Sequence, residues 1–263
     1  MEKGLKIGIV SLGLIGGSIL KALYDKYDCY CYSTTCPDNS FKYSKNISND
    51  IKIVSNCDIV FVCSPVSKTL EILNKLNNVL TPSTIVLDCA SSKKELLNKK
   101  FNFDFILSHP MAGKEQTGFE ASSEDLFKGS KWLIEKNNKV IEEIIKKTGA
   151  MPFLIDMTQH DYMCAQISHL PMLLAYALFY SADDNSKKIA SSGFRDMTRL
   201  ASNPKMSVDM LEFNNENIDR AFDKLINTIN GLKKLSYDEK IKLFNELSEK
   251  RALMYNKDGK NVF

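Results

Sequence analysis

The sequence predicts an α/β fold in which a doubly wound, parallel sheet is followed by an all-α region. Short apolar runs of strand length alternate with helical patterns over the first 156 residues. A glycine-rich turn follows the first of these runs, and strand patterns are absent after Thr158. Strands that alternate with helices in this way form parallel sheets with helices on both faces. We therefore divide the chain into residues 1–156 and residues 157–263.

The individual elements follow from apolar runs and from helical spacing. Strand-like apolar runs occupy residues 5–10, 29–33, 58–63, 84–88, 103–107, 131–135 and 151–155. Helical spacing occupies 15–26, 67–76, 93–100 and 139–148. Ser67 is expected to cap the second of these helices. In the helical region the predicted helices cover 163–180, 186–192, 205–212, 214–231 and 237–254, and the tail 255–263 is expected to be frayed.

A ligand crevice is expected at one edge of the predicted sheet. Ligands of doubly wound sheets bind beyond the carboxyl ends of the strands, where residues from neighbouring strands meet. The predicted ends are Val10, Cys63, Asp88 and Leu107. Ser64 and Pro65 directly follow one of these ends, so we expect both to lie in the crevice.

The turn after the first strand carries most of a dinucleotide-binding fingerprint. In the pattern GxGxxG, Gly13 and Gly16 occupy the second and third glycine positions, and Ser11 occupies the first. The second glycine lets the backbone approach a diphosphate, which would lie at the N-terminus of the next helix. The turn therefore predicts a Rossmann-type nucleotide site. The residues expected to bind the cofactor here are Ser11, Leu12, Gly13, Leu14, Ile15 and Gly16.

The end of the second predicted strand leaves the choice of cofactor open. Rossmann domains specific for NAD usually carry an acidic residue there, which binds the ribose hydroxyls. This chain has Ser33, Thr34 and Thr35 instead, and no arginine lies nearby in the sequence to favour a 2′-phosphate. We predict NAD as the cofactor, with NADP as the alternative, and Ser33 and Thr34 among its binding residues.

His109 is the main candidate for acid–base catalysis. It is one of three histidines in the chain and comes just after the predicted strand 103–107. Pro110 biases it toward extended geometry, and Gly113 and Gly118 permit a tight loop beyond it. An imidazole held in this way exchanges a proton near neutral pH. The alternative is a histidine that only completes a hydrogen bond within a loop.

Arginine is scarce in this chain, which draws attention to two of its positions. The 35 basic residues include only four arginines, and Arg195 and Arg199 lie four residues apart in one short segment. Where lysine is the usual cation, an arginine indicates a need for a planar group that makes two parallel hydrogen bonds. The alternative is a pair of ordinary surface residues.

Composition excludes several other classes of protein. The 35 basic and 32 acidic residues give a net charge of +3, which is too balanced to favour nucleic-acid binding. The seven cysteines form no CxxC pair and several lie in apolar runs, which is typical of reduced thiols in the cytoplasm. We therefore predict a cytoplasmic protein with no structural disulfide and no metal.

The first long helix of the second half is apolar on nearly every side. Such a helix is buried in its own domain or against a second subunit, and we predict a homodimer. Pro171 is expected to kink the helix near Ser168 and His169. Four glycines interrupt the apolar run at 7–20, and no other apolar stretch is expected to reach the ~18 residues that a membrane span needs. We therefore expect no membrane association.

Five segments form an ordered set of motifs along the chain. They are Gly-Leu-Ile-Gly-Gly-Ser at 13–18, Asp-Cys-Ala-Ser-Ser-Lys at 88–93, His-Pro-Met-Ala-Gly at 109–113 with Glu115 and Gly118, Ser-His-Leu-Pro at 168–171, and Gly-Phe-Arg-Asp-Met-Thr-Arg-Leu-Ala at 193–201. The set resembles the prephenate dehydrogenase family, including its arogenate and cyclohexadienyl forms, over nearly the whole chain. The resemblance implies a Rossmann-type domain at 1–156 and a helical substrate-binding and dimerisation domain at 157–263.

The resemblance also implies an activity. It implies an oxidoreductase of tyrosine biosynthesis that decarboxylates prephenate to 4-hydroxyphenylpyruvate and transfers a hydride to a nicotinamide cofactor. His109 is implied to deprotonate the ring hydroxyl, and Ser91 to orient the imidazole or that hydroxyl. Arg199 is implied to bind the ring carboxylate. The other implied substrate-binding residues are His169, Ser168, Glu115 and Met172.

Three departures from the family pattern keep alternatives open. Ser11 replaces a glycine, Met172 stands where the family often has a second histidine, and Ser207 lies where it often has a tryptophan. Arogenate is therefore an alternative substrate, and a catalytically impaired, dinucleotide-binding dimer is an alternative function. A dehydrogenase of the β-hydroxyacid type is a further alternative, but such enzymes usually use a lysine where this chain has His169.

Overall fold

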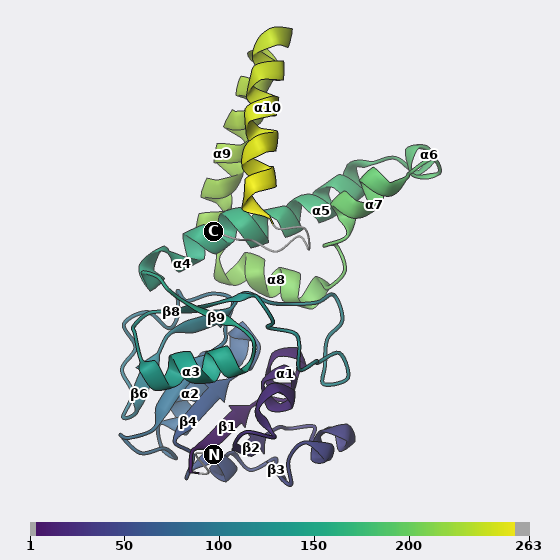
Figure 1. The fold of residues 1–263 in the computed structure, drawn as a ribbon. Helices are drawn as coiled ribbons and strands as arrows, with labels where there is room; N and C mark the ends of the chain where they lie inside the picture. Colours follow the sequence, from purple (N-terminus) through teal and green to yellow (C-terminus); the bar gives the residue numbers. More distant parts are fainter. Residues whose placement is uncertain (1–3, 256–263) are drawn as a thin grey trace.

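The computed structural model describes residues 4–255 and contains the predicted parallel sheet (Figure 1). Six strands lie in the order β3-β2-β1-β4-β5-β6, and every neighbouring pair is parallel. The strands are β1 Lys6–Val10, β2 Asp28–Tyr32, β3 Asn46–Ser48, β4 Ile59–Val62, β5 Ile85–Asp88 and β6 Asp104–Ile106. This is the strand order of a Rossmann sheet, so the predicted fold class is confirmed.

Helices cover both faces of this sheet because alternate strand residues are apolar on each side. One core combines Ile7 and Ile9 of β1 with α1 Leu14–Leu23 and α3 Lys139–Lys147. The other core combines Val60 and Val62 of β4 with α2 Val66–Leu76. Two short 3-10 helices, Asp38–Lys42 and Ile51–Val54, complete the connections.

His109 lies in a second, smaller sheet that the sequence does not predict. The predicted strand at 103–107 ends as β6 at Ile106, and the chain continues as β7 Ser108–Pro110. Strand β7 pairs antiparallel with β8 Lys131–Ile134, which pairs parallel with β9 Met151–Leu154. The imidazole is therefore carried by a strand that is hydrogen-bonded to its neighbour and not by a loop.

Two local predictions in the first half are wrong. Residues 93–100 form turns, because Asn98 has a φ of 62° and ends the single helical turn that starts at Lys93. Ser67 does not cap α2; that helix begins after Pro65, and no side chain caps it. Pro65 already supplies the fixed φ that suits a helix start.

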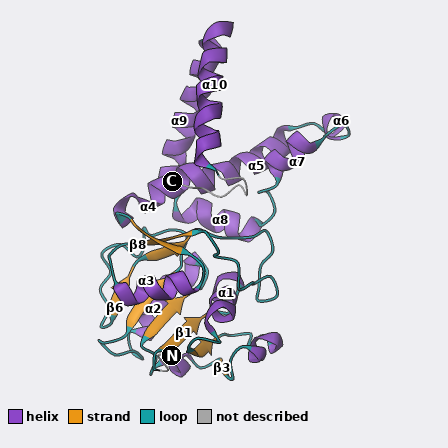
Figure 2. Ribbon diagram, viewed as in Figure 1, coloured by secondary structure: helices purple, strands orange, loops and turns teal. Residues whose placement is uncertain are grey.

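The second half is helical, as predicted (Figure 2). Its helices are α4 Met157–Cys164, α5 Leu170–Ser181, α6 Asp184–Lys187, α7 Ser192–Thr198, α8 Pro204–Phe213, α9 Asn215–Lys234 and α10 Tyr237–Met254. The helix predicted at 186–192 is instead divided between α6 and α7. Apart from Tyr255, the tail that was expected to be frayed lies outside the described residues.

A π-helical turn, Ala165–His169, joins α4 to α5 at the place where a kink is predicted. Pro171 follows it near the start of α5. The continuous helical run Met157–Ser181 is long and apolar enough to cross a membrane by length and composition, with a mean hydropathy of 1.2. The expectation that no such stretch occurs is therefore wrong, although a core helix of a soluble protein passes the same test.

Large apolar side chains remain exposed on the helices of the second half. Tyr180 at the end of α5 is 90% exposed, and α10 has no buried residue although it carries Phe244 and Leu247. Helix α5 buries only Leu170, Met172 and Ala175 within this chain. The helix predicted to be buried is thus only partly covered by its own domain, which leaves an apolar surface for another chain.

Candidate active site

The nucleotide turn has the backbone geometry that its glycine pattern predicts. Ser11 adopts a φ of 77°, a left-handed conformation that favours glycine, and its amide donates to the carbonyl oxygen of Tyr32 over 2.8 Å. A Cβ at Gly16 would overlap the carbonyl oxygen of Ser11. At Gly13 a Cβ would meet no atom within 4 Å. Ser11 therefore accepts the strained position of the first glycine, and the space beside Gly13 is open to a ligand.

The other residues expected at the cofactor surround the same edge of the sheet. Cys63, directly after β4, donates its amide to the carbonyl oxygen of Val10 at the end of β1 over 2.8 Å. Ser64 follows it, with its hydroxyl 3.2 Å from Thr69 Oγ1. Ser33 is buried after β2, and its hydroxyl lies 3.3 Å from that of Thr35. The ends of three neighbouring strands thus meet beside the turn, as the topology predicts.

A fully buried lysine anchors the strand that carries His109. Lys93 pairs with Asp88, and neither side chain is exposed. Its Nζ also donates to the carbonyl oxygen of Ser108 over 2.6 Å. Asp88 Oδ1 accepts the amide of Ser108 over 2.9 Å, and Trp132 Nε1 donates to the Ser108 hydroxyl over 3.2 Å. The residue before His109 is therefore held on every side by hydrogen bonds.

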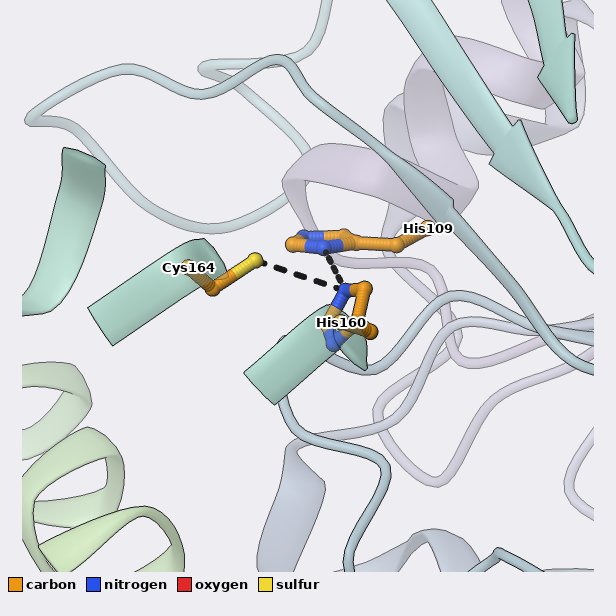
Figure 3. A group of neighbouring side chains, drawn as sticks. All are labelled: His109, His160 and Cys164. Carbon is orange, nitrogen blue, oxygen red and sulfur yellow. Dashed lines mark hydrogen bonds between the residues drawn. The ribbon is translucent and has the colours of Figure 1, made fainter. Parts of the chain in front are cut away.

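The imidazole of His109 contacts a second histidine and not the serine that the family resemblance suggests. His109 Nδ1 lies 2.9 Å from His160 Nε2 (Figure 3). His160 is fully buried, and its Nδ1 lies 2.7 Å from Asp161 Oδ1. Ser91 makes no side-chain hydrogen bond within residues 4–255. His160 lies at Nδ1 of the imidazole, where Ser91 was one candidate for orienting the ring. The other role expected of Ser91, orienting the substrate hydroxyl, stays a prediction.

The surroundings of His109 favour its neutral form. Burial first, and then the nearby His160 and Lys93, lower the pKa of His109 well below its usual value. Burial also lowers the pKa of His160, although Asp161 opposes this shift. A neutral imidazole near pH 7 has one nitrogen free to accept a proton, as a general base requires.

Three of the predicted substrate residues lie on the helical segment beyond this histidine pair. His169 is buried, and its Nδ1 lies 3.0 Å from Asn214 Nδ2. Burial lowers the pKa of His169 to about 4, so the ring is neutral. Ser168 is half-buried beside it in the π-helical turn, and Met172 is buried one turn further on. The irregular turn therefore places a polar pair directly before an apolar side chain.

Arg199 and Glu115, both predicted to bind substrate, form an ion pair with each other. Glu115 lies on the loop after β7, and Arg199 directly follows α7. The carboxylate is also bonded to its own backbone amide, and this bond together with Arg199 lowers the pKa of Glu115. The Arg199 side chain is 62% exposed. The pair thus joins the loop of His109 to the helical half at a position open to solvent.

Cys164 completes a cluster with the two histidines. Its Sγ lies 3.4 Å from His160 Nε2, and the three potential ligand atoms lie within 4.8 Å of one another. Two imidazoles and a thiol form a possible zinc donor set. However, a tetrahedral zinc ion would hold two ligand nitrogens roughly 3.4 Å apart. The 2.9 Å between the imidazole nitrogens is instead a hydrogen-bond length.

Sequence reasoning missed the residues that support His109. The sequence patterns do not single out His160 or Asp161 as site residues, and they place Lys93 only at the end of a motif and at the start of a predicted helix. One signal was available: His160 is one of only three histidines, and an acidic residue directly follows it. The contact itself joins residues 51 positions apart, so local patterns do not predict it.

Two family models match adjoining parts of the chain. "Prephenate dehydrogenase, nucleotide-binding domain" matches residues 38–151, and "Prephenate dehydrogenase, dimerization domain" matches residues 156–249. The chain belongs to the prephenate dehydrogenase family. It is accordingly an oxidoreductase with a nucleotide-binding domain. The first model starts beyond the glycine-rich turn, so the assignment of that turn depends on its geometry.

Similar proteins are named as prephenate or cyclohexadienyl dehydrogenases. The prephenate dehydrogenase of Lactococcus lactis subsp. cremoris is 28% identical over 81% of this chain and 69% of its own length. The cyclohexadienyl dehydrogenase of Zymomonas mobilis subsp. mobilis is 28% identical over 87% and 86%. The structure of an A. aeolicus prephenate dehydrogenase, in complex with hydroxyphenyl propionate and NAD+, is 27% identical. It matches with a TM-score of 0.80 over 94% of this chain and 97% of the other.

Proposed function

We propose that this chain converts prephenate to 4-hydroxyphenylpyruvate by oxidative decarboxylation, with NAD+ as the cofactor. The observation that carries the proposal is the placement of His109. Its strand is fixed by the buried Lys93, its ring is neutral, and its loop is joined through Glu115 to the helical half. A rigid base between a nucleotide domain and a second domain suits a dehydrogenase that removes a hydroxyl proton.

The residues of the nucleotide turn fit NAD+. Gly13 leaves open space for a diphosphate, and Gly16 allows the turn to pack closely. The N-terminus of α1 lies at the same turn, and its amide groups suit the negative charge. Ser33 and Thr34 would bind the adenine ribose, and Ser64 and Pro65 would line the cofactor at the start of α2. When bound, NAD+ supplies the hydride acceptor. The hydroxyls of Ser33 and Thr34 also permit NADP, which is the alternative cofactor.

In the proposed mechanism, His109 accepts the proton of the substrate hydroxyl, and Ser91 hydrogen-bonds that hydroxyl. Arg199 binds the ring carboxylate through its guanidinium group, which also pairs with the Glu115 carboxylate. Ser168, His169 and Met172 line the substrate on the helical side. Loss of the carboxylate makes the ring aromatic, so positioning is the main task of the protein.

An assay that follows reduction of the nicotinamide tests this proposal. Prephenate and arogenate are each supplied with NAD+ or NADP+, with 3-hydroxybutyrate as the probe for β-hydroxyacid activity. We expect reduction with prephenate and NAD+, accompanied by one CO₂ per reduced cofactor. Activity with arogenate alone would identify the alternative substrate. Bound NAD+ without turnover in all four combinations would contradict the proposal and favour the catalytically impaired dimer.

The assembly and the location of the protein belong to the same proposal. We place the nucleotide domain at residues 1–156 and the substrate-binding domain at 157–263. The family's dimerisation domain and the exposed apolar side chains of α5 and α10 support a homodimer. The seven free cysteines support a cytoplasmic location. Gel filtration is expected to give about twice the 29.7 kDa of one chain, and a stable monomer would contradict the dimer.

A further inference from the structure

A chain of hydrogen bonds leads from a buried carboxylate to the proposed base. His109 Nδ1 lies 2.9 Å from His160 Nε2 (Figure 3), and on the other side of the ring His160 Nδ1 lies 2.7 Å from Asp161 Oδ1. His160, the middle residue of these hydrogen bonds, is completely buried on α4. The two histidines come from different halves of the molecule. The contact therefore fixes one half against the other at the reacting group.

Asp161 determines the direction of these hydrogen bonds. Its carboxylate accepts the Ser92 hydroxyl over 2.8 Å and the backbone amides of Lys93 and Lys94 over 2.7 Å and 2.9 Å. Burial alone would raise the pKa of Asp161, but the hydrogen bonds from His160, Ser92 and Lys93 lower it. An ionised carboxylate only accepts hydrogen bonds. His160 must therefore carry a proton on Nδ1 and, as a neutral ring, a lone pair on Nε2.

In the described part of the chain, two groups lie within hydrogen-bond distance of that lone pair, the Cys164 thiol and His109 Nδ1. Burial raises the pKa of Cys164 to about 12, so the thiol keeps its proton and can donate to His160 Nε2 over 3.4 Å. His109 Nδ1 approaches the same atom and must donate as well, because two lone pairs would repel. The proton of His109 is thereby assigned to Nδ1. Its Nε2 is left unprotonated.

We infer that His160, held by Asp161, is a positioning residue that fixes His109 in the Nδ1–H tautomer and leaves Nε2 as the proton acceptor. This inference rests on the proposed function for the identity of the proton that Nε2 receives. When the hydroxyl O–H bond breaks, its proton moves to Nε2 and His109 becomes a cation. The hydrogen bond that His109 Nδ1–H donates to His160 Nε2 then strengthens. The negative charge of Asp161, on the far side of the His160 ring, favours the cation.

The tautomers are measurable without substrate, since the chain contains only three histidines. In protein labelled with ¹⁵N-histidine, with NAD+ present, two-bond nitrogen–proton spectra at about pH 7.5 report which ring nitrogen carries the proton. His109→Asn assigns its own signals by their loss. We expect the Nδ1–H form for His109 and His160. A predominantly Nε2–H form of His109 would overturn the inference.

Two substitutions at His160 separate positioning from general support of the fold. In His160→Gln, the side-chain oxygen can still accept a hydrogen bond from His109 Nδ1–H. The Nδ1–H tautomer is therefore retained, and kcat stays within about tenfold of the wild-type value. His160→Leu offers no acceptor, so His109 shifts toward the Nε2–H form and kcat falls about 10–100-fold, as for other lost outer partners. Affinity for NAD+ should not change in either variant.

Met163→Leu is the matched control on the same helix, because Met163 is 44% exposed whereas His160 is completely buried. Equal kcat and an unchanged tautomer in His160→Leu would overturn the inference. If His160→Leu does not fold, the wild-type spectrum and His160→Gln still decide the question. A wild-type protein with the expected tautomers but no prephenate turnover would instead count against the proposed function alone.

Discussion

Lys93 Nζ donates to the backbone carbonyl oxygen of Ser108 over 2.6 Å, inside a region with no access to solvent. The same ammonium group neutralises Asp88 at the end of β5. One buried charge pair thus connects the central sheet to the short strand on which His109 lies. Both the stability of the fold and the position of the imidazole depend on this link.

We expect Lys93→Met to destabilise the protein strongly. Removing the ammonium group leaves the Asp88 carboxylate buried and unpaired, which costs about 3–5 kcal/mol. The free energy of unfolding is measured with urea at fixed protein concentration. The double variant Lys93→Met/Asp88→Asn should recover part of the loss. Lys94→Met removes an exposed lysine and its surface ion pair with Glu216, and is the control that should change the urea midpoint only slightly. A wild-type midpoint for Lys93→Met would refute the role of the pair.

Gly13→Ala tests the nucleotide turn without disturbing the fold. A Cβ at Gly13 meets no protein atom within 4 Å, and its φ of −89° suits alanine. The methyl group would occupy the space assigned to the diphosphate. Affinity for NAD+ should therefore fall by at least about tenfold, roughly 1.4 kcal/mol, with no loss of thermal stability. Gly193→Ala, which also adds a methyl group in open space, is the control. Unchanged NAD+ affinity in Gly13→Ala would place the cofactor elsewhere.

Arg199→Gln should weaken substrate binding more than turnover. The variant keeps a hydrogen-bonding side chain but loses the positive charge that would face the ring carboxylate. We expect KM for prephenate to rise about 10–100-fold while kcat changes much less. Arg195→Gln is the matched control, because the Arg195 side chain is 77% exposed and, among residues 4–255, forms an ion pair only with its neighbour Asp196. A loss confined to kcat would contradict the assignment.

Acid should destabilise the protein, starting near the pKa of free histidine. The pKa values of His109, His160 and His169 are all lowered, with burial as the largest cause. Below about pH 6.5 the unfolded chain therefore binds protons that the folded chain does not. Each neutral histidine then reduces the free energy of unfolding by up to about 1.4 kcal/mol per pH unit as the pH falls. For His169 this continues to about pH 4.

Urea unfolding between about pH 7.5 and pH 5.5 measures this slope, at one protein concentration because the chain is expected to dimerise. His169→Gln should reduce the slope by about a third, since one of three histidines is removed. A free energy of unfolding that stays constant over this range would show that the three rings are not held neutral.

The parts of the fold that depend on neighbouring residues were predictable from the sequence. The strand β1, the turn at Ser11–Gly16 and the helix α1 follow one another within 20 residues, and their apolar spacing and glycines are local signals. The segment 93–100 was predicted to be a helix because of its apolar spacing. In the structure Asn98 has a positive φ that ends the helical turn, and the side chain of Lys93 is buried in the core.

The parts that depend on distant contacts were not predictable. Strand β7 has three residues and exists because β8 pairs with it, more than twenty positions further along the chain. His109 was therefore found as a residue type but placed in the wrong structural element. Its partner His160 is brought to it by tertiary contacts of α4, where the neighbouring Asp161 accepts the backbone amides of Lys93 and Lys94. The pairing of Glu115 with Arg199 across 84 positions has the same origin, although both residues were singled out.

The proton acceptor is the centre of the account, and His109→Asn tests it most directly. Asparagine keeps a hydrogen-bonding group but cannot take up the hydroxyl proton near pH 7. Turnover of prephenate is measured with NAD+. The Kd for prephenate is measured by calorimetry on the complex with an NAD+ analogue that cannot accept a hydride. We predict that kcat falls about 10²–10⁴-fold while Kd changes by less than about threefold. A variant that retains wild-type kcat would contradict the assignment of His109 as the base.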